Sequence, residues 1–218
     1  MKERGIIMRD WEVRAIQEGR KTMKRFVVKW PLRSRFDGCK SRLYFERDIP
    51  EMNERLSTWT RHPLFQFCPF GQVGERLWVR ETWAPHADMP GSAIYRCDRG
   101  GDYQDTVTPN FRWRPSIHMP RWACRLVLEI VSVRVERLQD ITEEDAEKEG
   151  VEHNGATDGS WSDSDGWIDY VDLASGGEGF PATTARESFQ SLWDSIYGNW
   201  NLNPYVWVVE FRKVEDNR

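Results

Sequence analysis

The sequence predicts a single α+β domain, residues 1–218, built as a small, mostly antiparallel and closed or nearly closed β-barrel with short helices at its rim. The predicted strands do not alternate regularly with helices, which disfavours an all-parallel α/β sheet. A chain of 218 residues can bury one sizeable core and requires no second one. Three stretches, about 30–67, 84–111 and 152–184, lack sustained periodicity and are predicted to be long insertions.

The N-terminal part predicts a short helix followed by a strand. We expect Asp10 to cap the helix and Gly19 to end it, because the apolar residues between them follow helical spacing. The first strand is expected at residues 26–28, directly after the basic run at residues 20–25. This run is either a solvated edge or a cluster of cations at the mouth of a pocket.

The middle of the chain predicts a turn and two strands. Gly71 and Gly74 mark the turn, and the alternation that follows predicts a strand over residues 77–80. A short strand is expected over residues 92–97. The two glycines are no phosphate-binding loop, because no helix that opens with Gly-Lys-Ser/Thr follows them.

A long strand and a short helix follow in series. Alternating apolar positions predict one strand over residues 124–138, bent near Ser132. A capping-box pattern at residues 142–145 opens the helix and Gly150 ends it. Glu149 lies at the C-terminal end of this helix, where the helix dipole disfavours a carboxylate. Its side chain is therefore either solvated or held there for a purpose.

The C-terminal part predicts a loop, a helix and a strand. Residues 153–184, rich in Gly, Ser, Asp and Thr, are expected to form a long mobile loop. Apolar residues at helical spacing predict an amphipathic helix over Ala185–Tyr197 that Gly198 ends. The apolar run at residues 205–212 predicts a buried strand that closes the sheet.

The loop at residues 112–122 combines cations with flat rings, a mixture that suits phosphates and bases. Its alternative interpretation is structural, with the basic residues solvated and the tryptophans in the core. The residues concerned are Arg112, Trp113, Arg114, His118, Arg121 and Trp122.

The formal net charge of −4 conceals an uneven distribution. Residues 152–178 hold seven acidic residues and no Lys or Arg, so the remainder of the chain carries 31 basic against 28 acidic residues. A surplus of three positive charges permits a nucleic-acid partner without requiring one, because the clustering of charge matters more than its sum.

The four cysteines are expected to be buried free thiols. Cys39, Cys68, Cys97 and Cys124 stand far apart and form no CxxC pair, so we predict neither a zinc site nor another cofactor. We find no signal peptide and no apolar run of spanning length, and therefore expect a cytoplasmic protein without a membrane partner.

Several segments together resemble the ASCH-domain proteins encoded by tailed phages and prophages, over roughly half of the chain. The resemblance implies a PUA-like β-barrel related to domains that bind RNA or read modified bases, with the insertions at the barrel rim. It also implies a phage or prophage protein in the bacterial host. The segments are GRKT at residues 19–22, GERLWVRETW within residues 69–83, WRPSIHMPRWA at 113–123, VERLQDITEEDAEKEG at 135–150, and SLWDSIYG with NPYVWVVEF at 191–198 and 203–211.

The resemblance also implies candidate catalytic residues. A small bacterial ASCH protein hydrolyses the amide of N4-acetylcytidine with a Lys, a Thr and a Glu, and the Lys and Glu fall on Lys21 and Glu149. The Thr falls on Lys24, which lacks the hydroxyl that such an amide hydrolase activates. Thr22 is adjacent, but in an extended segment it points to the opposite face from Lys21.

Two functions therefore compete, and the missing Thr favours binding. In the binding hypothesis, cations and rings form a cleft for single-stranded nucleic acid, RNA rather than DNA, or for a modified base. In the enzymatic hypothesis, Lys21 and Glu149 transfer protons on an N4-acylated cytidine, with Lys24 or a water in place of the hydroxyl. The residues of the expected cleft are Lys21, Lys24, Arg25, Arg114, His118, Arg121 and Trp122.

Overall fold

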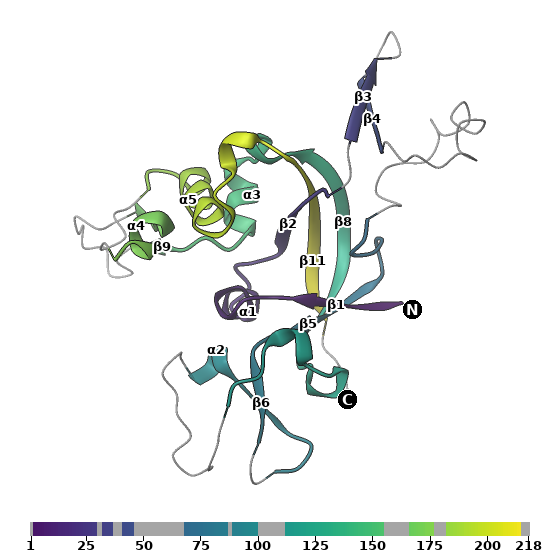
Figure 1. Cartoon of the computed structure of the whole chain (residues 1–218), viewed down its shortest axis with the longest axis vertical. Helices are drawn as coiled ribbons and strands as arrows, with labels where there is room; N and C mark the ends of the chain where they lie inside the picture. The colour runs from purple at the N-terminus through teal and green to yellow at the C-terminus, as the bar shows by residue number, and fades with distance from the viewer. Residues whose placement is uncertain are drawn as a thin grey trace.

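A five-stranded sheet forms the centre of the fold (Figure 1), in the order β1-β5-β8-β11-β2. The computed structural model describes residues 2–29, 32–36, 41–45, 68–86, 89–99, 112–154, 166–176 and 182–214. Only β1 and β5 run parallel, and the other neighbours are antiparallel. The strands are β1 (Glu3–Ile7), β2 (Met23–Val27), β5 (Arg76–Arg80), β8 (Val127–Arg137) and β11 (Tyr205–Val214).

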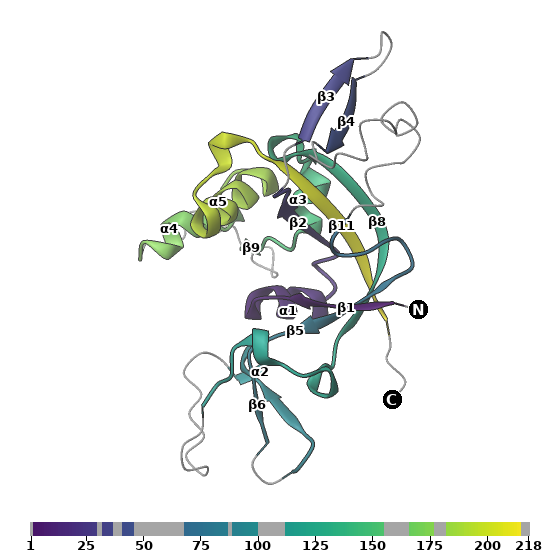
Figure 2. The ribbon, with the colours of Figure 1, turned by 45° about the vertical axis from the view of Figure 1, so that its right-hand side comes forward.

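Helices α3 and α5 pack on the face of β11 that carries Val206 and Val208. Helix α1 lies beside β1 and β5, near the other end of the long strands, as Figures 1 and 2 show from two directions. A second lobe, with β6, β7 and α2, lies beyond β5. The helices are α1 (Asp10–Gln17), α2 (Arg96–Arg99), α3 (Glu143–Lys148), α4 (Tyr170–Ala174) and α5 (Ala185–Tyr197). The short paired strands are β3 (Leu32–Phe36) with β4 (Ser41–Phe45), β6 (Trp83–Pro85) with β7 (Ala93–Tyr95), and β9 (His153–Asn154) with β10 (Gly166–Trp167).

Strand β11 is buried on both faces, which explains its continuous apolar sequence. Val206 and Val208 pack with residues of α3 and α5 in one apolar cluster. Trp207, Val209 and Phe211 point to the other face and pack with residues of α1, β1, β5 and β8. Because successive side chains of a strand alternate between faces, one strand joins both parts of the core.

The predicted barrel closure is wrong for the part of the chain that the structure describes. Among the described strands, β1 pairs only with β5 and β2 only with β11, so the sheet keeps two separate edges. Side chains bridge the gap instead: Lys24 Nζ on β2 lies 3.3 Å from the carbonyl oxygen of Ile7 on β1. The fold is thus mixed α and β with a mostly antiparallel, open sheet.

The long strand is confirmed with shorter bounds, since β8 begins at Val127 rather than at residue 124. Its partner β11 shifts register between Glu210 and Phe211, which leaves Val131 unpaired. A bulge of this kind bends a strand, and it lies beside the predicted bend at Ser132.

The N-terminal boundaries differ from the prediction in three ways. The strand expected at residues 26–28 is β2, which covers Met23–Val27. The cap of α1 is Arg9, and Asp10 is the first helical residue. Strand β1 was not predicted, because Glu3, Arg4 and Gly5 carry no apolar alternation that would identify an edge strand. Gly19 has a φ of 80° and ends α1 as expected.

The middle and C-terminal predictions hold in part. Strand β5 is confirmed, whereas the strand expected at residues 92–97 is only β7, and α2 begins at Arg96. Helices α3 and α5 are confirmed, with Thr142 and Gly198 at their expected ends. The prediction of a mobile loop is wrong for residues 166–176. There α4 packs on α5, and the Tyr170 amide donates to Ser191 Oγ at 2.9 Å. Residues 46–67 of the first predicted insertion lie outside the described residues.

Within the described ranges, no helix has both the length and the apolar character that crossing a membrane requires.

Near its C-terminal end β11 is buried on one face only, which predicts unequal effects of two neighbouring substitutions. Phe211→Ala should lower the free energy of unfolding by about 3–5 kcal/mol, because it opens a cavity in a packed core. Arg212→Ala, whose side chain is 68% exposed, should change it by less than about 0.5 kcal/mol. Urea unfolding followed by circular dichroism measures both, and equal effects would contradict the assignment of faces.

Candidate functional site

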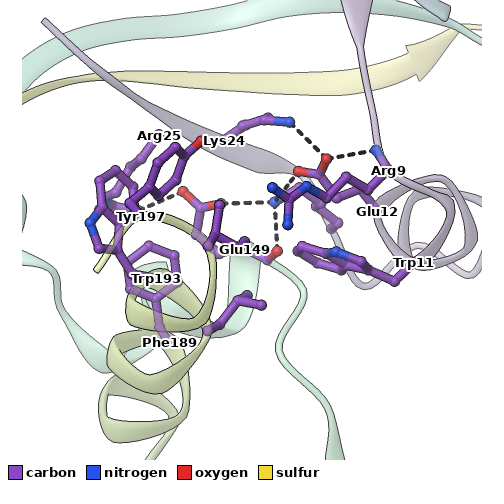
Figure 3. Close-up of a pocket in the computed structure, with 12 residues that line it drawn as sticks. Arg9, Trp11, Glu12, Lys24, Arg25, Glu149, Phe189, Trp193 and Tyr197 are labelled. Atoms are coloured by element: carbon purple, nitrogen blue, oxygen red, sulfur yellow. Dashed lines mark hydrogen bonds and ion pairs between the residues drawn. The ribbon is translucent and has the colours of Figure 1, made fainter. Parts of the chain in front are cut away.

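A small cavity lies where α1, the start of β2, the end of α3 and one face of α5 meet (Figure 3). Charged residues come from α1, β2 and the end of α3, while α5 contributes mainly apolar and aromatic side chains. The lining consists of Arg9, Trp11, Glu12, Lys21, Lys24, Arg25, Glu149, Phe189, Leu192, Trp193, Ile196 and Tyr197.

The backbone around Lys21 is tied to the ends of two helices. The Lys21 amide donates to the carbonyl of Ala15 in α1 at 3.0 Å, and the Thr22 amide donates to that of Lys148 in α3 at 2.9 Å. Gly150 has a φ of 85°, and a Cβ built on it would lie 2.8 Å from Lys21 Cβ. A glycine is therefore needed here both for its conformation and for the close approach of the two segments.

Lys21 and Glu149 form a buried ion pair. Lys21 Nζ lies 2.8 Å from Glu149 Oε2 and 2.6 Å from the Glu149 carbonyl oxygen. Lys21 is 2% exposed and Glu149 is 3% exposed. The ammonium compensates both the carboxylate and the negative end of the α3 dipole. Of the two interpretations of Glu149, solvated surface is therefore wrong.

Arg25 engages the second oxygen of the same carboxylate. Its Nη1 lies 3.1 Å from Glu149 Oε1, and its Nη2 lies 2.6 Å from Glu136 and 2.9 Å from Asp145. Arg134 contacts both Glu136 and Asp145 from the outside. Residues 20–25 are thus no simple solvated edge, since Lys21 and Arg25 are buried.

Glu12 is the central residue that the sequence prediction missed. Its carboxylate lies 2.7 Å from Lys24 Nζ and 3.8 Å from Lys21 Nζ, and it accepts from the Arg9 amide at 2.9 Å. Glu12 is buried in the same turn of α1 as Ala15 and Ile16. Glu12 lies three residues before Ala15 and four before Ile16, so it shares their buried helix face, and this spacing is the signal that could have identified it.

Burial and pairing act against each other on the pKa values of this cluster. Burial alone would raise the pKa of Glu12, but Lys24 and Lys21 outweigh it and hold that pKa below its ordinary value. Burial lowers the pKa of Lys24, and Lys21 adds to the shift although Glu12 opposes it. Lys24 therefore gives up its proton more readily than an exposed lysine does.

Aromatic rings form the other walls of the cavity. Lys21 Nζ lies 5.4 Å from the centre of the Trp11 ring, and Trp193 packs against Tyr197 with ring centres 4.5 Å apart. Tyr197 is 48% exposed and lies at the rim. The cavity thus offers flat apolar faces next to charged donors and acceptors.

The predicted cleft is divided between two places. Lys21, Lys24 and Arg25 surround the cavity, whereas the loop at 112–122 packs against β5 and β6 and contributes nothing to its lining. In that loop Arg114 stacks 5.2 Å from the Trp83 ring centre, and Trp122 is 51% exposed.

The other two residues of this loop that were predicted for the cleft, His118 and Arg121, also lie outside the cavity lining. Arg121 pairs with Glu3 at 3.0 Å, and His118 is exposed. The exposure of Trp122 excludes it from the core, and a role of this loop in nucleic-acid binding stays a prediction. Thr22 does not line the cavity either.

Three of the cysteines, Cys68, Cys97 and Cys124, are buried and free, which confirms that expectation for them, while Cys39 lies outside the described residues. No group of three or more potential metal ligands is found among the described residues.

No protein-family model, no curated protein and no solved structure matches the chain. The ASCH resemblance and the phage origin that it implies stay predictions.

The lowered pKa of Glu12 predicts how stability depends on pH. An acid with a lower pKa in the folded state stabilises the fold above its unfolded pKa, and this stabilisation is lost as the pH falls through its folded pKa. Glu12→Gln should therefore lose less unfolding free energy than the wild type between about pH 5 and pH 3. Urea titrations at several pH values measure this difference. Glu18→Gln, an exposed control at the end of α1, should retain the wild-type dependence.

Proposed function

We propose that the cavity binds a modified nucleobase, as a free nucleoside or within RNA. The observation that carries the proposal is the buried Lys21–Glu149 pair next to an aromatic wall. Burying an ion pair contributes little to stability, because desolvation offsets the attraction between the charges. A buried cluster of charges that lines a cavity therefore supports a binding or catalytic site.

The chemistry of the walls suits a base. A planar ring can stack on Trp11 or Tyr197, as bases do on aromatic side chains in proteins that bind single strands. The carboxylate of Glu12 can accept from an amino group, and Lys24 can donate to a carbonyl oxygen in exchange for its contact with Ile7 or Met8. One edge of a base presents both kinds of group.

The size of the cavity limits how a ligand enters. Its volume is about 40 Å³, which holds a few water molecules but no base. Arg9 and Tyr197 are the exposed residues of the lining, so they are the side chains that must move outward. We therefore expect local rearrangement at the rim, while the buried pair beneath it keeps its position.

Replacing Glu149 tests the proposal. N4-acetylcytidine should bind the wild type in a calorimetric titration, and Glu149→Gln should weaken binding at least about tenfold, since it leaves Lys21 and Arg25 without their shared carboxylate. Glu147→Gln, exposed on the same helix, should bind as the wild type does.

Breaking a buried pair costs about 3–5 kcal/mol, so the folding of each variant must be checked. Affinities are compared only between variants that show a cooperative thermal transition. Equal affinities of folded Glu149→Gln and Glu147→Gln for the ligand would contradict the proposed site.

A second candidate is hydrolysis of an N4-acylated cytidine, favoured by the 2.8 Å contact between Lys21 and Glu149. In this reaction water adds to the acyl carbon, the C–N bond breaks, and the amino nucleoside leaves with a carboxylic acid. The lining contains no Ser, Thr or Cys among the described residues, so a water would have to replace a protein nucleophile. Both Glu149 oxygens are also engaged by cations. These two facts make binding the first choice.

Replacing Lys24 separates the two candidates. Lys24→Thr places a hydroxyl at the rim next to Lys21 and Glu12, and should gain release of acetate from N4-acetylcytidine if the cavity retains a catalytic frame. Mass analysis of the products measures this gain. Lys24→Ala removes the ammonium without adding a hydroxyl and should stay inactive. Absence of acetate release by a folded Lys24→Thr that still binds the nucleoside would leave binding as the function.

A further inference from the structure

Arg9 is a cation at the mouth of the cavity, and it takes no part in the contacts proposed for the base. It precedes α1, lines the cavity, and its side chain extends across the opening in Figure 3. Its backbone amide donates to Glu12, whereas no carboxylate of the described residues forms an ion pair with its guanidinium. The side chain is exposed, unlike the other cations of the lining.

Around the cavity the cations outnumber the carboxylates by one, and Arg9 is the cation without a carboxylate partner among the described residues. Each of the four carboxylates in the cluster already contacts two cations other than Arg9. Five cations thus face four carboxylates. The cations are Arg9, Lys21, Lys24, Arg25 and Arg134, and the carboxylates are Glu12, Glu136, Asp145 and Glu149.

A surplus guanidinium at an opening attracts an anionic group of the ligand. Arginine suits phosphate in particular, because its planar fork of donors matches two phosphate oxygens. If the base enters between Trp11 and Tyr197, the sugar end stays at the rim, where Arg9 lies. A phosphate on that sugar would remain partly solvated and still reach the guanidinium.

We infer that the ligand is a nucleotide rather than a free nucleoside, with Arg9 as the residue that binds its phosphate. This inference rests on the proposed base-binding function and specifies its ligand class. The phosphate ester can belong to a mononucleotide or to an internal nucleotide of an RNA strand. Tyr197, which is exposed and lines the same cavity, completes the rim.

Calorimetric titration with N4-acetylcytidine and with its 5′-monophosphate tests the inference. The wild type should bind the monophosphate about ten- to a hundredfold more tightly at low salt, as expected for charge-assisted hydrogen bonds. Arg9→Gln should reduce this ratio to about one, and Arg9→Lys should restore part of it. Arg14→Gln, on the same helix but outside the cavity, should keep the wild-type ratio.

Two further ligands distinguish the sources of the phosphate. Ribose 5-phosphate should bind weakly, because it has no base to enter the cavity, and a trinucleotide with a central N4-acetylcytidine should exceed the monophosphate if the natural ligand is a strand. Equal wild-type affinities for nucleoside and monophosphate would overturn the inference and leave the base site intact. Binding of neither would overturn both. A ratio unchanged in Arg9→Gln would remove Arg9 from the site.

Discussion

The contact between Lys21 and Glu149 is the constraint on which the site depends. Two charges that are each at most 3% exposed must remain paired, since an uncompensated buried charge would cost several kcal/mol. The pairing fixes the end of α3 against the segment that enters β2. Arg25 and Glu12 extend the same network to β8 and α1. The positions of the elements around the cavity are therefore set by charge pairing as well as by apolar packing.

The sheet supplies the rigid base for this network. Strand β11 is buried on both faces and pairs with β2 and β8, which carry Arg25 and Glu136. Close approach at Gly150 brings the backbone of α3 against Lys21. The rim differs in character, because Arg9 and Tyr197 are exposed. A buried pair beneath an exposed rim is an arrangement that allows a ligand to enter without loss of the site's geometry.

Patterns of neighbouring residues correctly predict the helices and strands that such residues alone determine. The apolar spacing of α5, the Thr142 cap of α3 and the two-sided apolar run of β11 each identify an element from adjacent residues. Barrel closure and the edge strand β1 depend on pairing between distant segments, which periodicity does not encode. The same limit applies to the site. The predicted Lys21 and Glu149 do meet in the structure, whereas Glu12 is not predicted. The prediction that the 112–122 loop shares their cleft is wrong, because that loop lies on another lobe.

Nuclear magnetic resonance can map the ligand site. Backbone amide and indole signals of the nitrogen-15-labelled protein would be followed during titration with N4-acetylcytidine 5′-monophosphate. We predict that the ligand binds at the cavity, so that the shifting signals cluster at the start of α1, at Lys21, at Gly150 and along the α5 face with Trp193 and Tyr197. Shifts confined to the 112–122 loop and to β6 and β7, with the signals around Lys21 and Gly150 unchanged, would contradict it.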